Sequence, residues 1–407
     1  MRQLRFILCL LSISMFTGDL HAQFNFSGEL RPRTEYSHGY KTLAAEDQDP
    51  SVFTSQRTRL NLQYADSLFQ TKVTLQDVRL WGSQPQLVGN EDFATSLHEA
   101  WLQVDLPGYF ALKAGRQEVV YDNHRIFGNV GWAQQGRSHD MAIVKYNGGI
   151  KMHLGLAYNQ NSNRTTNFYT GPDAYKSLHF LWVHRTIADA DVSFLFLNNG
   201  IPYPETTGPG GAMTKQGIRY SQTFGPYIEY KLNNANLSGS FYYQTGKDAA
   251  GNDLSAFEFF LQYHMNLNDN INVKAGYEIL SGTDYDETET NHSFTPLYGT
   301  NHKFNGHMDY FFVGNHINSV GLHDLFLGGT YAEDKFKLGG TAHMFSSYAE
   351  IAPNTDQYLG LEIDLSAGYQ YSENIGFTIG YSHLFSSDAM ETLKGGSSDV
   401  YQNWAYL

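Results

Sequence analysis

The stretch "RTRLNLQYADSLFQTKVTLQ", residues 57–76, contains two alternating segments joined by a short turn. Polar side chains occupy the odd positions of residues 57–64 and the even positions of residues 69–76. A period of two residues is typical of a β-strand with one polar and one apolar face. The turn Ala65-Asp66-Ser67 is long enough only to connect antiparallel neighbours. The stretch therefore predicts a β-hairpin with one polar face.

The same alternation recurs along the chain, for example in residues 99–106, 271–279 and 359–367. Counting such segments predicts about 18 strands. Their expected starts lie near residues 23, 54, 69, 97, 109, 139, 150, 176, 190, 216, 235, 255, 271, 321, 335, 356, 374 and 399.

The connections between these strands fall into two length classes that alternate without a break. Residues 107–108, 188–189 and 333–334 are short turns, whereas residues 120–138, 161–175 and 283–320 are long connections. Outer-membrane barrels have short periplasmic turns, longer extracellular loops and an even number of strands. A soluble β-sandwich or propeller would not sort its loops in this way. We therefore expect an all-β fold, a transmembrane antiparallel β-barrel of about 18 strands.

The N-terminus has the features of a secretory leader. Arg2 and Arg5 precede an apolar run over residues 6–16, and Leu20-His21-Ala22 resembles a cleavage site. This pattern predicts a signal peptide over residues 1–22 and a single barrel domain over residues 23–407. The single cysteine of the sequence, Cys9, lies in the leader. The mature chain therefore offers no disulfide, thiolate metal site or cysteine nucleophile.

The stretch "GELRPRTEY", residues 28–36, carries a charge at every second position. In a membrane barrel the apolar residues face lipid and the polar residues face the lumen, so we expect these charges to point inward. The expected lumenal basic residues on this wall are Arg31, Arg33, Arg57, Arg59, Lys72, Arg79 and Lys113. The acids interleaved with them are Glu29, Glu35, Asp77 and Glu99.

A wall rich in guanidinium groups suits the passage of anions, because arginine binds carboxylates and sulfates bidentately. Charges that line a water-filled pore select solutes by sign and geometry. The formal net charge of −14 does not contradict an anion pathway, since much of the acid lies in expected loops such as residues 46–49 and 284–289. The alternative is that arginines and acids brace the wall by internal ion pairs. The two roles are compatible.

Residues 97–140 read "LHEAWLQVDLPGYFALKAGRQEVVYDNHRIFGNVGWAQQGRSHD". Together with Arg57-Thr58-Arg59, "LYGTNHKFNGHMDYFFVGN" at 297–315 and "NWAYL" at 403–407, this block resembles the alginate export family of outer-membrane barrels, in its Bacteroidetes-type form. The resemblance extends from about residue 24 to the end of the chain, and the block at 97–140 is its specific part.

The resemblance implies a barrel that conducts an anionic polysaccharide outward through an arginine-lined constriction. It adds Arg116, Arg125 and Arg137 to the expected pathway, and Glu118, Asp122 and Asp140 as counter-charges. One departure concerns the last strand, residues 400–407, which is short and ends on leucine instead of the aromatic residue that assembly machinery reads. We therefore expect either a truncated chain or an unusual closure.

Other residue clusters give weaker signals. His292, His302, His307, His316 and His323 are irregularly spaced, which favours a polar loop over a metal site. The acidic run at 284–289 lacks the glycine-turn spacing of a calcium loop, so a solvated loop is the favoured interpretation. Ser138-His139-Asp140 cannot form a catalytic triad from adjacent positions. We expect no catalytic residue, metal, cofactor or nucleic-acid partner.

Tyrosines near the expected strand ends predict an interfacial girdle on the lipid face. They are Tyr64, Tyr158, Tyr230, Tyr263 and Tyr369. Lumenal aromatic residues such as Trp101 are better candidates for contact with a passing glycan.

The sequence thus predicts a non-enzymatic, passive channel for anionic polysaccharide or oligosaccharide in the outer membrane of a Gram-negative bacterium. The alternatives are a general or small-anion porin, and a non-conducting barrel that serves as a surface binder or adhesin. The expected partners are outer-membrane lipid, the assembly machinery and an anionic glycan or small anion. The family resemblance implies a monomer.

Overall fold

The structure, a computed structural model, describes residues 23–86, 95–161, 168–171, 175–208 and 213–407. The expected signal peptide lies outside these residues. Within the described part of the chain, no helix is long and apolar enough to cross a membrane.

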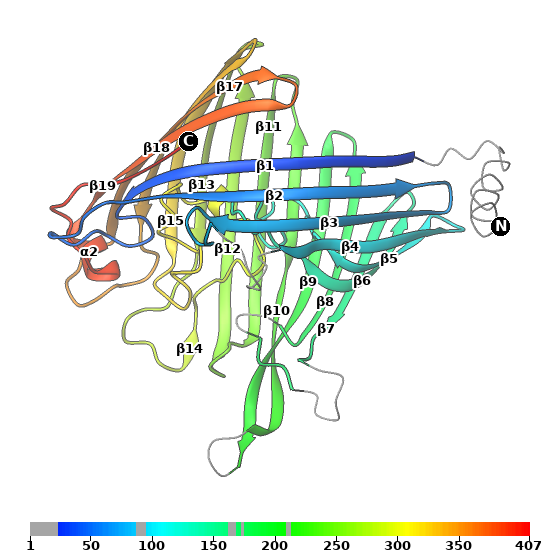
Figure 1. Cartoon of the computed structure of the whole chain (residues 1–407). Coiled ribbons are helices and arrows are strands. Elements are labelled where there is room, and N and C mark those ends of the chain that lie inside the picture. The colour runs from blue at the N-terminus through cyan, green and yellow to red at the C-terminus, as the bar shows by residue number, and fades with distance from the viewer. Residues whose placement is uncertain (1–22, 87–94, 162–167, 172–174, 209–212) are drawn as a thin grey trace, which may run out of the picture.

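The chain is almost entirely β-structure (Figure 1). The strands are β1 (Gln23–His38), β2 (Ser51–Ala65), β3 (Phe69–Leu80), β4 (Thr95–Leu106), β5 (Phe110–Gln117), β6 (His139–Asn147), β7 (Lys151–Tyr158), β8 (Ser177–Ile187), β9 (Ala190–Thr207), β10 (Met213–Lys231), β11 (Ala235–Lys247), β12 (Asp253–Asn266), β13 (Ile271–Leu280), β14 (Thr290–Asn291), β15 (Leu322–Glu333), β16 (Phe336–Ser346), β17 (Tyr358–Ser372), β18 (Ile375–Ser386) and β19 (Gln402–Tyr406). Among the described residues, two short helices accompany them, η3 (Asn301–Lys303) and α2 (Asp388–Lys394).

The strands form a closed antiparallel barrel of 18 strands, which confirms the fold predicted from the alternation. Each barrel strand pairs with its sequence neighbours, except that β13 pairs directly with β15. The two-residue β14 is not part of the wall, since it belongs to a loop and pairs in parallel with the start of β12. The barrel is closed by β19, which pairs with β18 on one side and with residues 35–38 of β1 on the other.

The outer surface of the barrel is apolar, as a lipid-facing surface requires. In β1, Leu30 is 67% exposed, whereas the flanking Glu29 and Arg31 are partly covered on the lumenal side. The expected girdle tyrosines occupy outward positions of their strands, and Tyr158, Tyr230 and Tyr263 are exposed. The short turns all lie at one end of the barrel, which we take as the periplasmic end.

Two of the long loops fold into the lumen. One is L3, residues 118–138 between β5 and β6, and the other is L7, residues 281–321 between β13 and β15. Their backbones pair with each other: the Gly128 amide donates to the Tyr298 carbonyl (2.9 Å), and the Tyr298 amide donates to the Ile126 carbonyl (3.1 Å). Buried apolar side chains of both loops, including Phe127 and Phe294, join the core cluster. These loops narrow the lumen and position the candidate site.

Candidate functional site

L3 is held on the wall formed by β1 and β2, through hydrogen bonds from arginines to loop carbonyls. Arg31 Nη1 donates to the carbonyl oxygen of Gly131 (2.8 Å). Its Nη2 donates to the carbonyl oxygens of Trp132 (3.0 Å) and Ala133 (3.1 Å). The side-chain oxygen of Gln134 accepts from both Nε and Nη2 of Arg31. All these partners are neutral, so the positive charge of Arg31 is not cancelled by a direct ion pair.

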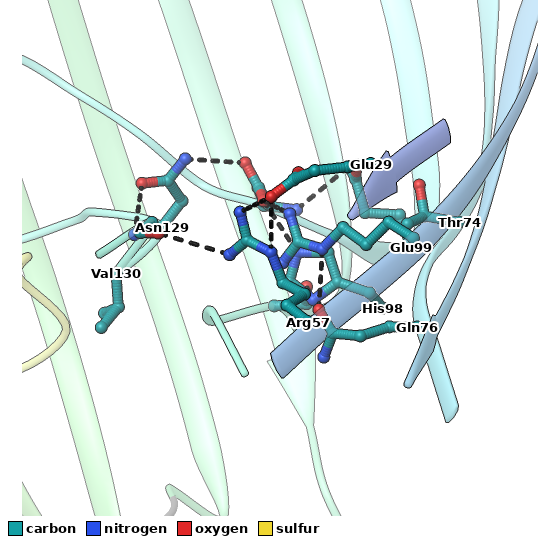
Figure 2. Close-up of polar contacts among 12 residues, drawn as sticks. Glu29, Arg57, Thr74, Gln76, His98, Glu99, Asn129 and Val130 are labelled. Atoms are coloured by element: carbon teal, nitrogen blue, oxygen red, sulfur yellow. Dashed lines mark hydrogen bonds and ion pairs between the residues drawn. The ribbon is translucent and has the colours of Figure 1, made fainter. Parts of the chain in front are cut away.

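The other arginines of this wall combine loop contacts with ion pairs. Arg33 donates to the Trp132 carbonyl (2.8 Å), pairs with Glu35 (2.9 Å) and stacks over the Trp132 ring at 4.4 Å. Arg57 Nε donates to Glu29 (3.0 Å), as Figure 2 shows. Its Nη1 reaches the Ala133 carbonyl (3.3 Å). The guanidinium groups of Arg31, Arg33 and Arg57 are thus bonded both to the wall and to L3 or to L3 alone, and the bracing role that the sequence left open is present.

Arg59 reaches the start of L3. Its Nε donates to the Gln76 side chain (2.7 Å), and its Nη1 lies 3.9 Å from a carboxylate oxygen of Glu118. Glu118 also accepts hydrogen bonds from His98 (2.7 Å) and Asn129 (2.9 Å). Burial raises the pKa of Glu118, but these hydrogen bonds and the nearby charges outweigh burial and lower it overall. Glu118 therefore stays ionised and ties L3 to the wall.

L7 is held on the opposite side of the barrel by an acidic wall. The Asn305 amide donates to Glu278 (2.7 Å) and to Asp324 (3.2 Å). The backbone amide of Met308 donates to Glu362 (2.8 Å). The acidic wall was not predicted from the sequence. Its members are each at most 2% exposed: Glu258, Glu278, Asp324, Glu362 and Asp364. The signal that could have found them is the same alternation, because all five lie at inward positions of their strands.

Arg125 connects the two sides. It lies in L3, is 0% exposed, and forms an ion pair with Glu278 across the lumen. Its Nε is 2.7 Å from Glu278 Oε1, its Nη2 donates to Asn305 (3.0 Å), and its guanidinium lies 4.0 Å over the Phe304 ring. The structure therefore places Arg125 in the packed junction between L3 and the acidic wall, not on an open lumenal surface.

Two glycines allow L3 and L7 to approach this closely. A Cβ atom on Gly128 would collide with Thr300, and one on Gly299 would collide with the carbonyl of Arg125. Both residues belong to the stretches that carry the family resemblance.

The packed loops separate two cavities. The outer cavity, about 610 Å³, faces the loop end of the barrel and is lined by residues that include Arg33, Lys41, Trp132 and Arg137. The inner cavity, about 340 Å³, lies toward the turn end and is lined by residues that include Glu229, Lys274 and Lys303. In the outer cavity Arg137 donates to the Gly299 carbonyl (2.8 Å), and burial lowers its pKa. Among the described residues Arg137 has no carboxylate partner, so it contributes an uncompensated positive charge.

Two arginines that were expected to line the pathway point away from the lumen. Arg79 is paired in register with Gln56, and Arg116 with Asp140, all at outward positions. Arg79 bonds to Asp77 (2.6 Å), and Arg116 bonds to Asp140 (2.9 Å). The expectation of lumenal positions for Arg79, Asp77, Arg116 and Asp140 is therefore wrong. Asp77 and Arg79 lie an odd number of residues from the inward Lys72, and Arg116 from the inward Lys113, and a strand alternates faces at every step. Asp140 pairs with Arg116 and therefore shares its face.

The remaining expected residues face inward and have partners of their own. Lys72 pairs with Glu99, and Lys113 lies 3.9 Å over the ring of Trp101. Trp101 donates its indole N–H to Glu99 (3.0 Å). Asp122, in L3, accepts from Ser193 (2.7 Å) and Trp182 (3.0 Å), and burial raises its pKa.

The histidines of L7, and His323 at the start of β15, serve as structural hydrogen-bonding groups. His302 bonds to Asp309 (2.6 Å), His292 to the Ser255 carbonyl (2.8 Å), and His323 to Tyr277 (2.7 Å). His307 lies 3.8 Å from Asp364. No group of three or more potential ligands that could hold a metal occurs among the residues that the structure describes.

The segment Ser138-His139-Asp140 has three separate sets of contacts. Ser138 lies near His98 (3.3 Å), His139 near Tyr175 (3.1 Å) and Asp140 near Arg116 (2.9 Å). Their side chains therefore do not form a catalytic triad.

His316 makes the packing of L7 dependent on pH. Its Nε2 lies 3.0 Å from the Gly321 carbonyl, and the ring is buried against Phe311 and Phe312. Burial, with Lys394 nearby, lowers the pKa of His316 to about 3. An opened loop binds a proton below its ordinary pKa of about 6.5, whereas the packed loop does not. The packed loop therefore loses stability as pH falls below about 6.5, by roughly 2 kcal/mol at about pH 5.

We expect L7 of the purified protein to be cleaved faster at pH 5 than at pH 7 by a protease that is active at both. His316→Gln should flatten this pH dependence, whereas His264→Gln, a matched change on β12, should preserve it. An unchanged slope in His316→Gln would assign the effect to another group.

No family model matches the chain, and no curated protein matches it in a sequence comparison. The resemblance to the alginate export family is therefore not confirmed. Solved structures do match. Pseudomonas aeruginosa OccK9 (OpdG) is similar with a TM-score of 0.61 at 12% identity, covering 95% of this chain and 97% of that chain. Pseudomonas aeruginosa OccK3 (OpdO) is similar with a TM-score of 0.60 at 12% identity, covering 94% of this chain and 93% of that chain.

A third similar structure is Pseudomonas aeruginosa OpdK with vanillate, with a TM-score of 0.58 at 8% identity, covering 95% of this chain and 97% of that chain. These neighbours are outer-membrane β-barrel channels. At such low identity the similarity establishes the fold. Together with the apolar outer surface, it places this barrel in the outer membrane of a Gram-negative bacterium.

Proposed function

We propose that the protein is a passive outer-membrane channel for small anionic solutes. The observation that carries this proposal is the outer cavity beside the inward-folded L3, where basic groups outnumber free acids. Lys41 and Arg137 line this cavity, and Arg137 is bonded to a neutral partner, whereas the acids that line it already have donors. Glu35 is bonded by Arg33 and Trp404, and Asp309 by His302 and Tyr40.

Small solutes fit this lumen better than a polysaccharide does. L3 and L7 pair with each other and share a buried apolar core. An extended polymer would have to displace that core, whereas a small anion can move beside it. The neighbour OpdK was crystallised with vanillate, a small carboxylate, which favours the small-anion porin among the alternatives. Export of an alginate-like chain is the weaker proposal.

Planar-bilayer recordings test the proposal. We expect the protein to form open channels with anion preference, because Arg137 is an uncompensated cation facing the cavity. Arg137→Gln should lower the anion-to-cation permeability ratio by about fivefold at low salt, since one nearby charge changes local ion energies by roughly 1 kcal/mol in water.

Arg116→Gln is the matched control, because it removes an arginine from the outer face and should leave selectivity unchanged. Cation preference in the unmodified channel would contradict the anion pathway. An absence of conductance would favour the surface binder.

A further inference from the structure

The inner cavity is a second candidate site, separate from the arginine wall. Its volume is about 340 Å³, within the size range of small-molecule sites. It lies on the other side of L3 and L7 from the outer cavity, and its walls come from β10–β13, β15 and β16 together with both loops.

One wall of the cavity is a row of residues in register across four strands. Glu229 on β10 pairs with Ser238 on β11, Ser238 with Gln262 on β12, and Gln262 with Gly276 on β13. A Cβ atom on Gly276 would collide with the ring of Phe326. The row therefore begins with a carboxylate, continues with a hydroxyl and an amide, and ends under an aromatic ring.

Some charged groups that line the cavity have an ion-pair partner, and others have none. Glu278 is paired with Arg125, and Asp324 with His343. Asp122 accepts hydrogen bonds from Ser193 and Trp182, which are neutral.

In contrast, Lys274, Lys303 and Glu229 form no ion pair within the described part of the chain. Lys303 donates to the Asn123 carbonyl (3.1 Å), and Glu229 accepts from Asn236 (3.0 Å). Both lysines line the inner cavity, and burial and the charge of Lys274 lower the pKa of Lys303.

These three groups come from different walls of the cavity: Glu229 from β10, Lys274 from β13 and Lys303 from L7. β10 and β13 are three strands apart, about 14 Å between backbones at the usual strand spacing. The inward-extending side chains shorten this span, and an extended dipeptide is about 7 Å long. Apolar surface for a side chain is supplied by Phe260, Phe304 and Phe326.

We propose that the inner cavity binds a zwitterion of dipeptide length that carries an apolar side chain. Glu229 receives the ammonium group, and Lys274 and Lys303 receive the carboxylate. Ser238 and Gln262 bond the central amide, and the phenylalanine rings pack against the side chain.

Titration calorimetry of the purified full-length barrel tests this with three probes: glycyl-phenylalanine, its N-acetyl derivative and its C-terminal amide. We expect the free dipeptide to bind saturably and each blocked form to bind about tenfold more weakly, because each loses one charge-assisted contact. Equal affinities for the three probes, or no saturable binding of any of them by a barrel with intact β-sheet circular dichroism, would overturn the proposal.

Substitutions test which residues bind the amino end and the carboxyl end of the dipeptide. Glu229→Gln should abolish the preference for the free over the N-acetylated probe, and Lys274→Gln should narrow the preference for the free probe over the amide. The matched controls Asp105→Asn and Lys145→Gln, on β4 and β6, should change neither preference. Loss of binding in the controls as well would contradict the assignment. The measurement requires no ion conduction, so its outcome is independent of the bilayer recordings.

Discussion

Replacing Arg125 with methionine should release L3 from the barrel wall and raise the single-channel conductance several-fold. Arg125 is fully buried and pairs with Glu278 across the lumen. Removing one partner of a buried ion pair leaves an uncompensated charge and costs about 3–5 kcal/mol. Opening of L3 relieves that cost because it lets water reach Glu278. Single-channel recordings and the rate of proteolysis within L3 measure the effect.

The double variant Arg125→Met/Glu278→Gln separates this mechanism from a simple loss of packing. Replacing both members of a buried pair by neutral groups is far milder than removing one. We therefore expect the double variant to recover most of the protection of L3 and most of the original conductance. Arg116→Met, which removes an outward-facing ion pair, should behave like the unmodified protein. If the single variant also keeps its conductance and protection, Arg125 does not hold the constriction.

The two loops are held by walls of opposite hydrogen-bonding character. β1 and β2 present guanidinium donors, which bond the carbonyls of L3 at Gly131, Trp132 and Ala133. The strands from β13 to β17 present carboxylates, which accept from N–H groups of L7 such as that of Met308. Each wall therefore matches the backbone atoms that its loop offers.

The barrel itself could be predicted from the sequence, because lipid imposes a period of two on every strand. The segment 57–76 shows the pattern, and the hairpin of β2 and β3 pairs Leu60 with Leu75 as the alternation requires. The same rule, counted strictly from Lys113, also places Arg116 on the outside. That error came from transferring a resemblance by position instead of following the alternation.

The inward folding of L3 and L7 could not be predicted from the sequence. A loop has no repeating period, so its residues do not indicate which side of the barrel they occupy. The contact of Arg125 with Glu278 joins residues 153 positions apart, and nothing in either local sequence marks the pair. The resemblance block at 97–140 included all of L3, but it suggested an arginine-lined constriction where the structure has packed loops.

Lysine substitutions at Arg31 and Arg57 should show whether these arginines only hold L3 in place or also select anions. Lysine keeps the positive charge, but it cannot reproduce the several contacts by which Arg31 holds Gly131, Trp132 and Gln134. We therefore expect Arg31→Lys/Arg57→Lys to loosen L3, with faster proteolysis and higher conductance, while anion preference persists. Hydrogen bonds to charged groups contribute about 1.5–3 kcal/mol each, so the effect on L3 should be large.

The glutamine pair, Arg31→Gln/Arg57→Gln, loses the charge as well as the contacts. If the wall selects solutes, this pair should lose most of its anion preference in reversal-potential measurements, and the lysine pair should not. If the wall only braces L3, the two pairs should show the same selectivity, because they loosen the loop alike. Equal selectivity would therefore confine the guanidinium groups to holding the constriction and would assign anion preference to other cations, such as Arg137.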